Sequence, residues 1–397
     1  MSIDKGRIMP IVEENLGKDG HTHLCMLMVT HSCNLNCVYC YEKHKSGAEM
    51  SFEVAQNAIR EEVEFIRNSK GRFSKFQIDF MGGEPLLNYK LIKRVVEWLE
   101  ECDFGIPYTC FASTNGTVLT EEMKDWFRNH KDKIWLGLSY DGTAEMQSVN
   151  RNNCTVDVGF FREAWPDYPV RMTISRQTIR DLHQGVSAIV NDGRHPEVSL
   201  ALGEDWTRQD AEELGNQLLR LIDDYFEGRV PDILNVFTYR LNGILNGSGT
   251  VVGCGAARNM ITYDVDGRKY GCHMFTPIVL GVENSLPLQE FEKLLQISKP
   301  DPRCAGCILE GFCSTCLGFN YRNRGDIAKR DDKLCLMTLV VAKCACLFQI
   351  RALTAKKELT EEDAEMAKVA LEAWPLLEKY DLKKAVAPFV KMTKERR

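Results

Sequence analysis

Beyond a polar start, the first half of the chain alternates short apolar runs with longer amphipathic segments. The runs are rich in β-branched, aromatic or leucine residues and end at polar turns, which predicts strands. They are Leu24–Thr30, Phe76–Phe80, Tyr108–Ser113, Ile134–Ser139, Val170–Ser175 and Val198–Leu202. The predicted helices are Ser51–Asn68, Tyr89–Glu101, Thr120–Asn129, Gly159–Ala164, Thr178–Asn191 and Thr207–Phe226. Ser51 precedes an apolar face that begins at Val54, so we expect it to cap its helix.

Six strand–helix units in series predict an α/β protein with a parallel sheet and right-handed crossovers. A closed TIM barrel needs eight such units. We therefore expect an open, TIM-like partial (β/α)6 barrel over residues 21–245, after an N-terminal extension of residues 1–20.

The pattern changes near Asn242–Gly255, where Gly and Asn cluster and helical periodicity stops. From Cys254 to Cys346 cysteines are dense and we expect little regular structure. Metal–ligand bonds hold such segments more than an apolar core does. The sequence predicts a cysteine-rich domain over residues 246–350. A C-terminal helical tail of residues 351–397 follows, with its helix near Thr360–Tyr380.

Composition excludes several classes of function. The 397 residues carry a net charge of −6, which offers no basic surface for nucleic acid. No apolar run looks long enough to cross a membrane, and the polar first residues contain no secretory signal. Sixteen cysteines without an export signal favour reduced thiols and metal ligation. We expect a cytoplasmic protein with neither a nucleic-acid nor a membrane partner.

The most specific chemical feature is a loop with the spacing C-x3-C-x2-C, formed by Cys33, Cys37 and Cys40. Three thiolates can hold three irons of a [4Fe–4S] cluster and leave the fourth iron open to a cofactor or substrate. The alternatives are ordinary buried cysteines or a zinc site, which usually has four protein ligands. His31 and His44 lie close enough in sequence to keep zinc open at this point. The spacing favours iron.

Further motifs follow three of the predicted strands. They are Gly82-Gly83-Glu84-Pro85, Ser113-Thr114-Asn115-Gly116 and Ser139-Tyr140-Asp141-Gly142. Parallel sheets of this kind bind ligands at the carboxyl ends of their strands. With the cysteine loop, this pattern resembles the radical S-adenosylmethionine (SAM) superfamily over most of residues 24–202.

The resemblance implies that SAM chelates the open iron. One electron, from a flavodoxin- or ferredoxin-type donor, then cleaves SAM to methionine and a 5′-deoxyadenosyl radical that abstracts hydrogen from a substrate. The implied cofactor-binding residues are Tyr39, Gly82, Gly83, Glu84, Ser113, Asn115, Ser139 and Arg151.

Seven of these eight residues, all except Ser139, have a physical role in this reading. Gly82 and Gly83 allow a close backbone approach to the methionyl group. Glu84 positions its loop or accepts from the ammonium of SAM, and Arg151 suits the SAM carboxylate. Ser113 and Asn115 are polar contacts, and Tyr39 lies against the adenine. The plainer alternatives are a surface salt bridge for Arg151 and a turn role for Asn115.

The second group of cysteines resembles the SPASM extension of radical SAM enzymes, which carries two auxiliary [4Fe–4S] clusters. Asp266-Gly267 predicts a hairpin between Tyr263–Val265 and Arg268–Cys272. The resemblance assigns an outer cluster to Cys304, Cys307, Cys313 and Cys335, and an inner one to Cys254, Cys272 and Cys316.

Two features of this group leave alternatives open. The last cysteine pair is C-x2-C, where the family more often has C-x3-C, and a zinc knuckle would also fit such pairs. The inner cluster is one ligand short, so it has either an open iron or a further ligand in Cys344 or Cys346.

SPASM enzymes mostly modify peptides or proteins. We expect a maturase of a ribosomally made peptide, forming a thioether or carbon–carbon cross-link. The alternative is an anaerobic sulfatase-maturing enzyme that oxidises Cys or Ser to formylglycine. Those enzymes typically have an aspartate base where this chain has His273, which can also take a proton. Only 32 residues precede Cys33, too few for a leader-binding domain. A non-catalytic zinc scaffold is the remote alternative.

Overall fold

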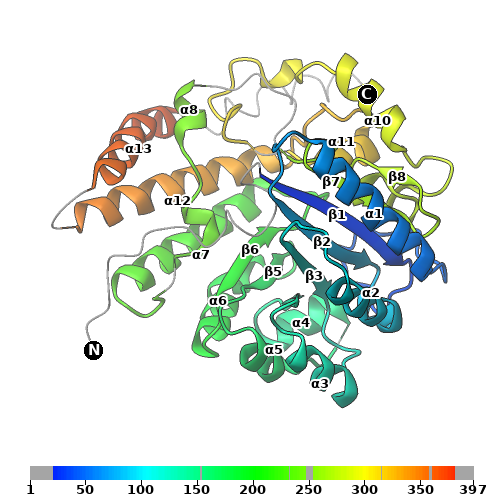
Figure 1. Cartoon of the computed structure of the whole chain (residues 1–397). Coiled ribbons are helices and arrows are strands. Elements are labelled where there is room, and N and C mark those ends of the chain that lie inside the picture. Colours follow the sequence, from blue (N-terminus) through cyan, green and yellow to red (C-terminus); the bar gives the residue numbers. More distant parts are fainter. Residues whose placement is uncertain are drawn as a thin grey trace. The chain divides into compact units, whose positions relative to one another are not determined.

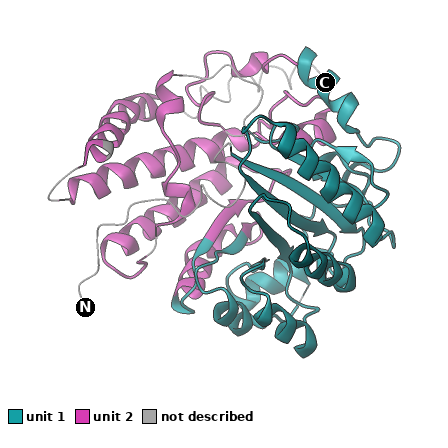
Figure 2. Cartoon of the chain, in the orientation of Figure 1, with its two compact units in different colours: residues 1–172, 191–196, 254–297 teal, residues 173–190, 197–253, 298–397 magenta. Residues whose placement is uncertain are grey.

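The computed structural model describes residues 21–152, 154–231, 233–246, 254–313, 315–356 and 360–380. It divides into two compact units, shown in Figure 2. The first unit contains residues 1–172, 191–196 and 254–297, and the second contains residues 173–190, 197–253 and 298–397. These units are defined by contacts within the chain, and the domain boundaries expected from the sequence stay a prediction.

A six-stranded sheet in the order β4-β3-β2-β1-β7-β8 forms the centre of the first unit (Figure 1). Its strands are β1 (Thr22–Thr30), β2 (Lys75–Gly82), β3 (Tyr108–Thr114), β4 (Ile134–Leu138), β7 (Met260–Tyr263) and β8 (Lys269–Tyr270). Strands β1 to β4 run parallel, as expected. The hairpin is also confirmed, because β7 pairs antiparallel with β8. The parallel pairing of β7 with β1 was not predicted.

The remaining two strands, β5 (Val170–Ile174) and β6 (Pro196–Leu200), form a two-stranded sheet. A parallel bridge between Ser139 and Arg171 continues the strand order from β4 to β5. All six predicted barrel strands are therefore present, and the α/β partial-barrel fold is confirmed.

Helices cover one face of the six-stranded sheet (Figure 1). Alternate residues of β1, namely Cys25, Leu27 and Val29, enter one apolar core with side chains of the first unit's helices. The helices of this unit are α1 (Phe52–Asn68), α2 (Tyr89–Glu101), α3 (Glu121–Asn129), α4 (Ala144–Arg151), α5 (Val158–Ala164), α9 (Pro277–Leu280) and α10 (Leu288–Ile297). The predicted cap is present, because the Ser51 hydroxyl accepts from the backbone N–H of Val54. Helix α4 was missed, since it contains few apolar residues.

The second unit is mainly helical. Its helices are α6 (Leu182–Asn191, preceded by a 3-10 turn), α7 (Arg208–Phe226), α8 (Asn242–Asn246), α11 (Leu317–Arg324), α12 (Leu334–Thr354) and α13 (Glu361–Lys379). Helix α12 packs against both α7 and α13. The predicted C-terminal helix corresponds to α13.

Helix α12 corrects two expectations from the sequence. The cysteine-rich segment is not short of regular structure, because α12 alone has 21 residues. It is also long and apolar enough, at a mean hydropathy of 1.7, to cross a membrane by length and composition. Its apolar residues surround the helix instead of forming a stripe, so no helical period marks it. In the structure 44% of this stretch is buried, and Ala342 and Leu339 pack with Ala370 of α13.

Candidate active site

The three-cysteine loop follows β1 directly, at the carboxyl end of the parallel strands. Cys33, Cys37 and Cys40 are each partly buried. Burial raises the pKa of the Cys37 thiol to about 11, and the nearby Cys40 and Cys33 add to this shift. Burial also raises the pKa of Cys33. A cationic group bound at these thiols would favour their thiolate forms. The donor set and its placement therefore fit the cluster that the spacing predicts.

The two glycines after β2 provide the space for this loop. A Cβ on Gly83 would lie 2.3 Å from the backbone oxygen of Ser32 and 2.8 Å from Cβ of Cys33. A Cβ on Gly82 would lie 2.3 Å from the backbone oxygen of Thr30. Glycine is required here by the close approach of the cysteine loop itself, while the predicted approach to SAM stays a prediction.

Glu84 connects the ends of two strands. Its side chain is 1% exposed, and its Oε1 accepts from the Thr114 hydroxyl at 2.7 Å while its Oε2 accepts from the Asn115 N–H at 2.8 Å. The N–H of Leu86, in the 3-10 turn Pro85–Asn88, also donates to Oε1. Burial raises the pKa of Glu84 to about 6, against the effect of these donors. The contacts support the loop-positioning role that the sequence suggested.

Asn115 contacts the cysteine loop through its own side chain. Its Nδ2 donates to Oδ1 of Asn34 at 3.0 Å, and Asn34 in turn donates to the Thr117 hydroxyl at 2.7 Å. Asn115 Oδ1 also accepts from Thr117, as a turn residue would. The side chain thus fixes the segment between Cys33 and Cys37, and its contact with SAM stays a prediction.

A buried ion pair lies beside the three-cysteine loop. It joins Asp141, shortly after β4, to Arg151 at the end of α4. Arg151 binds Asp141 with both Nε and Nη2, at 3.0 and 3.2 Å, and is 6% exposed. The Tyr39 hydroxyl donates to the same carboxylate at 2.7 Å, and the Arg151 guanidinium lies 5.4 Å from the Tyr39 ring centre. Arg151 also opposes the rise in the pKa of Cys37. Because both residues are buried, this is not a surface salt bridge. The guanidinium of Arg151 already has a carboxylate partner in Asp141.

Ser113 and Ser139 lie where the sequence placed them, at the ends of β3 and β4. Both are partly buried, and the Ser139 N–H donates to the Thr114 oxygen at 2.9 Å. Tyr39, Gly82, Gly83, Glu84, Ser113, Asn115, Ser139 and Arg151 thus gather at or beside the carboxyl ends of β1 to β4. Their individual contacts with SAM are not tested by this arrangement.

The β7–β8 hairpin is joined to α1 and β1 by a polar network. Glu62 of α1 accepts from the Tyr263 hydroxyl at 2.6 Å, pairs with His23 at 2.6 Å and with Lys269 at 3.1 Å. His31 was one of the zinc candidates. Its Nε2 lies 2.6 Å from Oδ1 of Asp264 in the hairpin turn. The hairpin that precedes Cys272 is therefore fixed to the body of the first unit.

His273 follows this hairpin in the 3-10 turn His273–Phe275. Its Nε2 lies 3.2 Å from the hydroxyl of Tyr41, directly after Cys40, and its Nδ1 lies 3.6 Å from the sulfur of Cys272. Burial lowers the pKa of His273 to about 4, so the ring is neutral at neutral pH and its protonated form is disfavoured. Tyr41 was not singled out from the sequence, since the contact joins residues 232 positions apart.

The four cysteines of the predicted outer cluster come together in the second unit. Each of Cys304, Cys307 and Cys313 raises the pKa of Cys335, which burial brings to about 12. Cys313 and Cys307 likewise raise the pKa of Cys304. This grouping joins the loop after the 3-10 turn Pro302–Cys304 to the first turn of α12. The donor set fits a fully ligated cluster.

The predicted inner set is divided between the two units. Cys254 and Cys272 belong to the first unit and Cys316 to the second, so their assignment to one cluster stays a prediction. Cys344 and Cys346 are buried in α12. The Cys346 thiol contacts the backbone oxygen of Ala370 at 3.1 Å within an apolar cluster, where it acts as a small core residue.

Across the residues that the structure describes, no three His, Cys, Asp or Glu side chains lie close enough to share one metal ion. A structural zinc site holds four ligands around one ion at about 2.0–2.3 Å. Each thiolate of a cubane instead binds a different iron, which separates the ligands more widely. The looser grouping of the cysteines is compatible with clusters.

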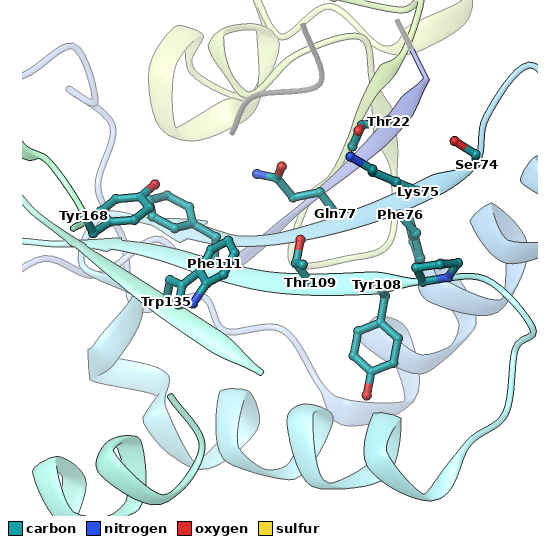
Figure 3. A pocket seen from close by; sticks show the side chains of 11 residues that line it. Thr22, Ser74, Lys75, Phe76, Gln77, Tyr108, Thr109, Phe111, Trp135 and Tyr168 are labelled. Atoms are coloured by element: carbon teal, nitrogen blue, oxygen red, sulfur yellow. The ribbon is translucent and has the colours of Figure 1, made fainter. Parts of the chain in front are cut away.

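A cavity of about 390 Å³ lies at the opposite, amino-terminal ends of the strands (Figure 3). Figure 3 shows Phe111, Trp135 and Tyr168 gathered at one side of it and Gln77 directed between them and Thr22. The ring centres of Phe111 and Tyr168 are 5.5 Å apart. The cavity is lined by strand beginnings, whereas the cysteine loop follows the end of β1, so it is separate from the candidate site.

Fold and loop together define an iron–sulfur protein of the partial-barrel class. Residues 27–157 match the model of the Radical SAM superfamily, so the chain contains a radical SAM domain. Members of this superfamily bind SAM and a [4Fe–4S] cluster, so the family, the fold and the cofactors expected from the sequence are confirmed.

Relatives differ in how much of the chain they match. An uncharacterized protein of Methanocaldococcus jannaschii is 36% identical over 124 residues, which cover 31% of this chain and 40% of that protein. The radical SAM cyclopropyl synthase TigE of Paramaledivibacter caminithermalis is 22% identical over 78% of this chain and 71% of its own length. A cysteine-type anaerobic sulfatase-maturating enzyme of Clostridium perfringens is 28% identical over 31% of this chain and 33% of its own length.

Solved structures share the fold over most of the chain. The enzyme anSMEcpe, with bound AdoMet and a Cp18Cys peptide, superposes with a TM-score of 0.62 at 18% identity, covering 84% of this chain and all 100% of that one. SuiB of Streptococcus suis, bound to its precursor peptide SuiA, gives a TM-score of 0.50 at 15% identity over 79% of this chain and 76% of that one. At these identities the likeness concerns the fold.

Proposed function

We propose that this radical SAM enzyme modifies a side chain of a peptide or protein, forming a thioether or carbon–carbon cross-link after hydrogen abstraction. The observation that carries the proposal is the pairing of the positioned three-cysteine loop with a second, four-cysteine group in one chain. Peptides in the named complexes of anSMEcpe and SuiB support the substrate class.

The bound cofactors would supply one-electron cleavage of SAM to a 5′-deoxyadenosyl radical. Cys33, Cys37 and Cys40 would hold the cluster, and the arrangement around Glu84 and Asp141 holds their loop in place. Positioned ligands lower the barrier by holding reacting groups in a productive orientation. Neutral His273 would accept the proton that leaves the substrate, with Tyr41 orienting its ring.

The proposal is tested by replacing Cys37 with alanine in the anaerobically purified, iron-loaded protein. We expect loss of 5′-deoxyadenosine formation from SAM under reducing conditions, because the loop would lose one of three cluster ligands. Cys102→Ala is the matched control, since this partly buried cysteine follows α2, away from the loop. Continued SAM cleavage by the Cys37 variant would contradict the assignment.

His273→Gln addresses the second part of the mechanism. The variant removes the proton acceptor while retaining a hydrogen-bonding side chain, so SAM cleavage should persist and product formation should fall at least tenfold. Candidate peptides encoded beside this gene are the substrates to co-express, and mass spectrometry would show the loss of two hydrogens per link. Unchanged product yield would remove His273 from the mechanism.

Sulfatase maturation is the second candidate function, supported by the C. perfringens relative. Incubation with a peptide that carries a sulfatase-type Cys or Ser separates the two, because only this function yields formylglycine. A non-catalytic zinc scaffold would give a colourless protein that leaves SAM intact. A flavodoxin- or ferredoxin-type electron donor and a cytoplasmic location stay predictions.

A further inference from the structure

Two polar side chains lie against the four-cysteine group of the second unit. The Tyr380 hydroxyl, at the end of α13, donates to Sγ of Cys307 at 3.7 Å. The guanidinium of Arg330 lies beside Cys313, because its Nη1 donates to the backbone oxygen of that residue at 3.1 Å. A hydroxyl and a cation from two distant places in the sequence thus reach this group.

Arg330 also brings a positive charge to this group. Its Nη1 donates to the backbone oxygens of Glu310 and Cys313, at 3.2 and 3.1 Å. No carboxylate within 4 Å pairs with this guanidinium in the part of the chain that the structure describes. The carboxylate of Asp301 accepts from the backbone N–H of Arg330 at 3.0 Å and is paired with the guanidinium of Arg303 at 2.6 Å.

The three-cysteine loop has a different electrostatic surrounding. Its guanidinium, Arg151, is bound through two nitrogens to buried Asp141, which cancels most of its charge. Among the described residues, the sulfurs of this loop accept a hydrogen bond only from within the loop, where the backbone N–H of Leu35 donates to Sγ of Cys33 at 3.4 Å. Hydrogen bonds to sulfur and nearby positive charge both favour the reduced, more negative state of an iron–sulfur cluster.

We propose that Arg330 and Tyr380 raise the reduction potential of the cluster that Cys304, Cys307, Cys313 and Cys335 hold, above that of the three-cysteine loop's cluster without SAM. The inference rests on the proposed function for the presence of both clusters. With four protein ligands this cluster has no open iron, so its reaction is the gain or loss of one electron, with no bond made or broken in the protein. The two side chains are positioning residues that bias this transfer.

Tyr380→Phe is the sharpest test because the ring, which packs on the apolar cluster around α12 and α13, is retained. Potentials are measured by electron paramagnetic resonance on poised samples of the anaerobic holoprotein. The background is Cys33→Ala, Cys37→Ala and Cys40→Ala, which removes the loop's cluster, and the signal is assigned by its loss in Cys304→Ala. We expect the reduction equilibrium to fall about tenfold, or about 59 mV for one electron.

Arg330→Gln should lower the potential in the same direction, whereas Arg330→Lys, which keeps the charge, should lower it less. Tyr225→Phe is the control, because that tyrosine of the same unit packs on Phe348 at 5.0 Å and should leave the potential unchanged. Unchanged potentials in both Tyr380→Phe and Arg330→Gln would overturn the proposal. So would zinc in place of iron at the four cysteines. SAM cleavage by the wild-type protein tests the proposed function separately.

Discussion

At the scale of single residues, the first unit contains a buried carboxyl group in Asp79 whose ionisation costs stability. Asp79, on β2, is 2% exposed and accepts from Nε2 of Gln77 at 2.8 Å. Burial raises the pKa of this carboxyl to about 7, despite Gln77 and the charge of Arg171. A buried carboxylate is costly unless it is well paired, so this residue weakens the fold when it ionises.

Asp79→Asn tests this residue. The folded protein keeps the Asp79 proton up to about pH 7, while the unfolded chain releases it near pH 3.8, so wild-type stability falls between these values and is then constant. The variant should lack this decline and gain up to about 4 kcal/mol relative to wild type by pH 8. Melting temperatures of both proteins from pH 5 to 8 provide the measurement, with exposed Asp132→Asn as control. A difference between variant and wild type that does not vary with pH would contradict the expectation.

At the scale of elements, the site depends on loops that meet strand ends at close range. The turn after β2 contacts the cysteine loop after β1 without room for a side chain, and Glu84 joins β2 to β3. The strand order therefore determines which loops touch. Replacing one glycine should disturb iron binding without removing any ligand.

Gly83→Ala makes this prediction specific. A Cβ 2.3 Å from the backbone oxygen of Ser32 must displace the loop that contains Cys33, and backbone cannot move as cheaply as a flexible side chain. We expect SAM cleavage to fall at least tenfold, with less iron bound per chain. Gly47→Ala is the control, because nothing lies within 4 Å of its added methyl group. Wild-type iron content and activity in the Gly83 variant would show that the loop can adjust.

At the scale of the whole molecule, the core of the first unit and the four-cysteine loop of the second unit have different sources of stability. The first has a large apolar core between sheet and helices, while the four-cysteine loop of the second contributes few buried apolar side chains. Cysteine ligands that bind metal only in the folded state couple binding to folding. The loop around the four cysteines should therefore depend on its cluster for order.

Removing iron with an anaerobic chelator tests this dependence. Amide hydrogen exchange should accelerate at least tenfold over residues 301–335, where Cys304, Cys307 and Cys313 lie, while β1 to β4 retain their protection. Zinc-free re-loading with iron and sulfide should restore slow exchange. Equal acceleration in the central strands would mean that the cluster stabilises the whole chain instead.

The class of cofactor and most of the strands and helices could be predicted from the sequence alone. Cysteine spacing and the motifs after predicted strands are local features, and the ends of parallel strands must meet at one edge of a sheet. That was sufficient for the partial barrel and the cofactors, while the assignment of Cys304, Cys307, Cys313 and Cys335 to one cluster stays a prediction.

Only the tertiary structure decided which side chains support those groups. Tyr380 meets Cys307 across 73 positions, Tyr41 meets His273 across 232, and β7 joins the sheet beside β1. Periodicity reports which face of an element is buried and not which distant element covers it. Helix α12 escaped prediction for the same reason, since a helix buried on several sides has no polar face to give it a period.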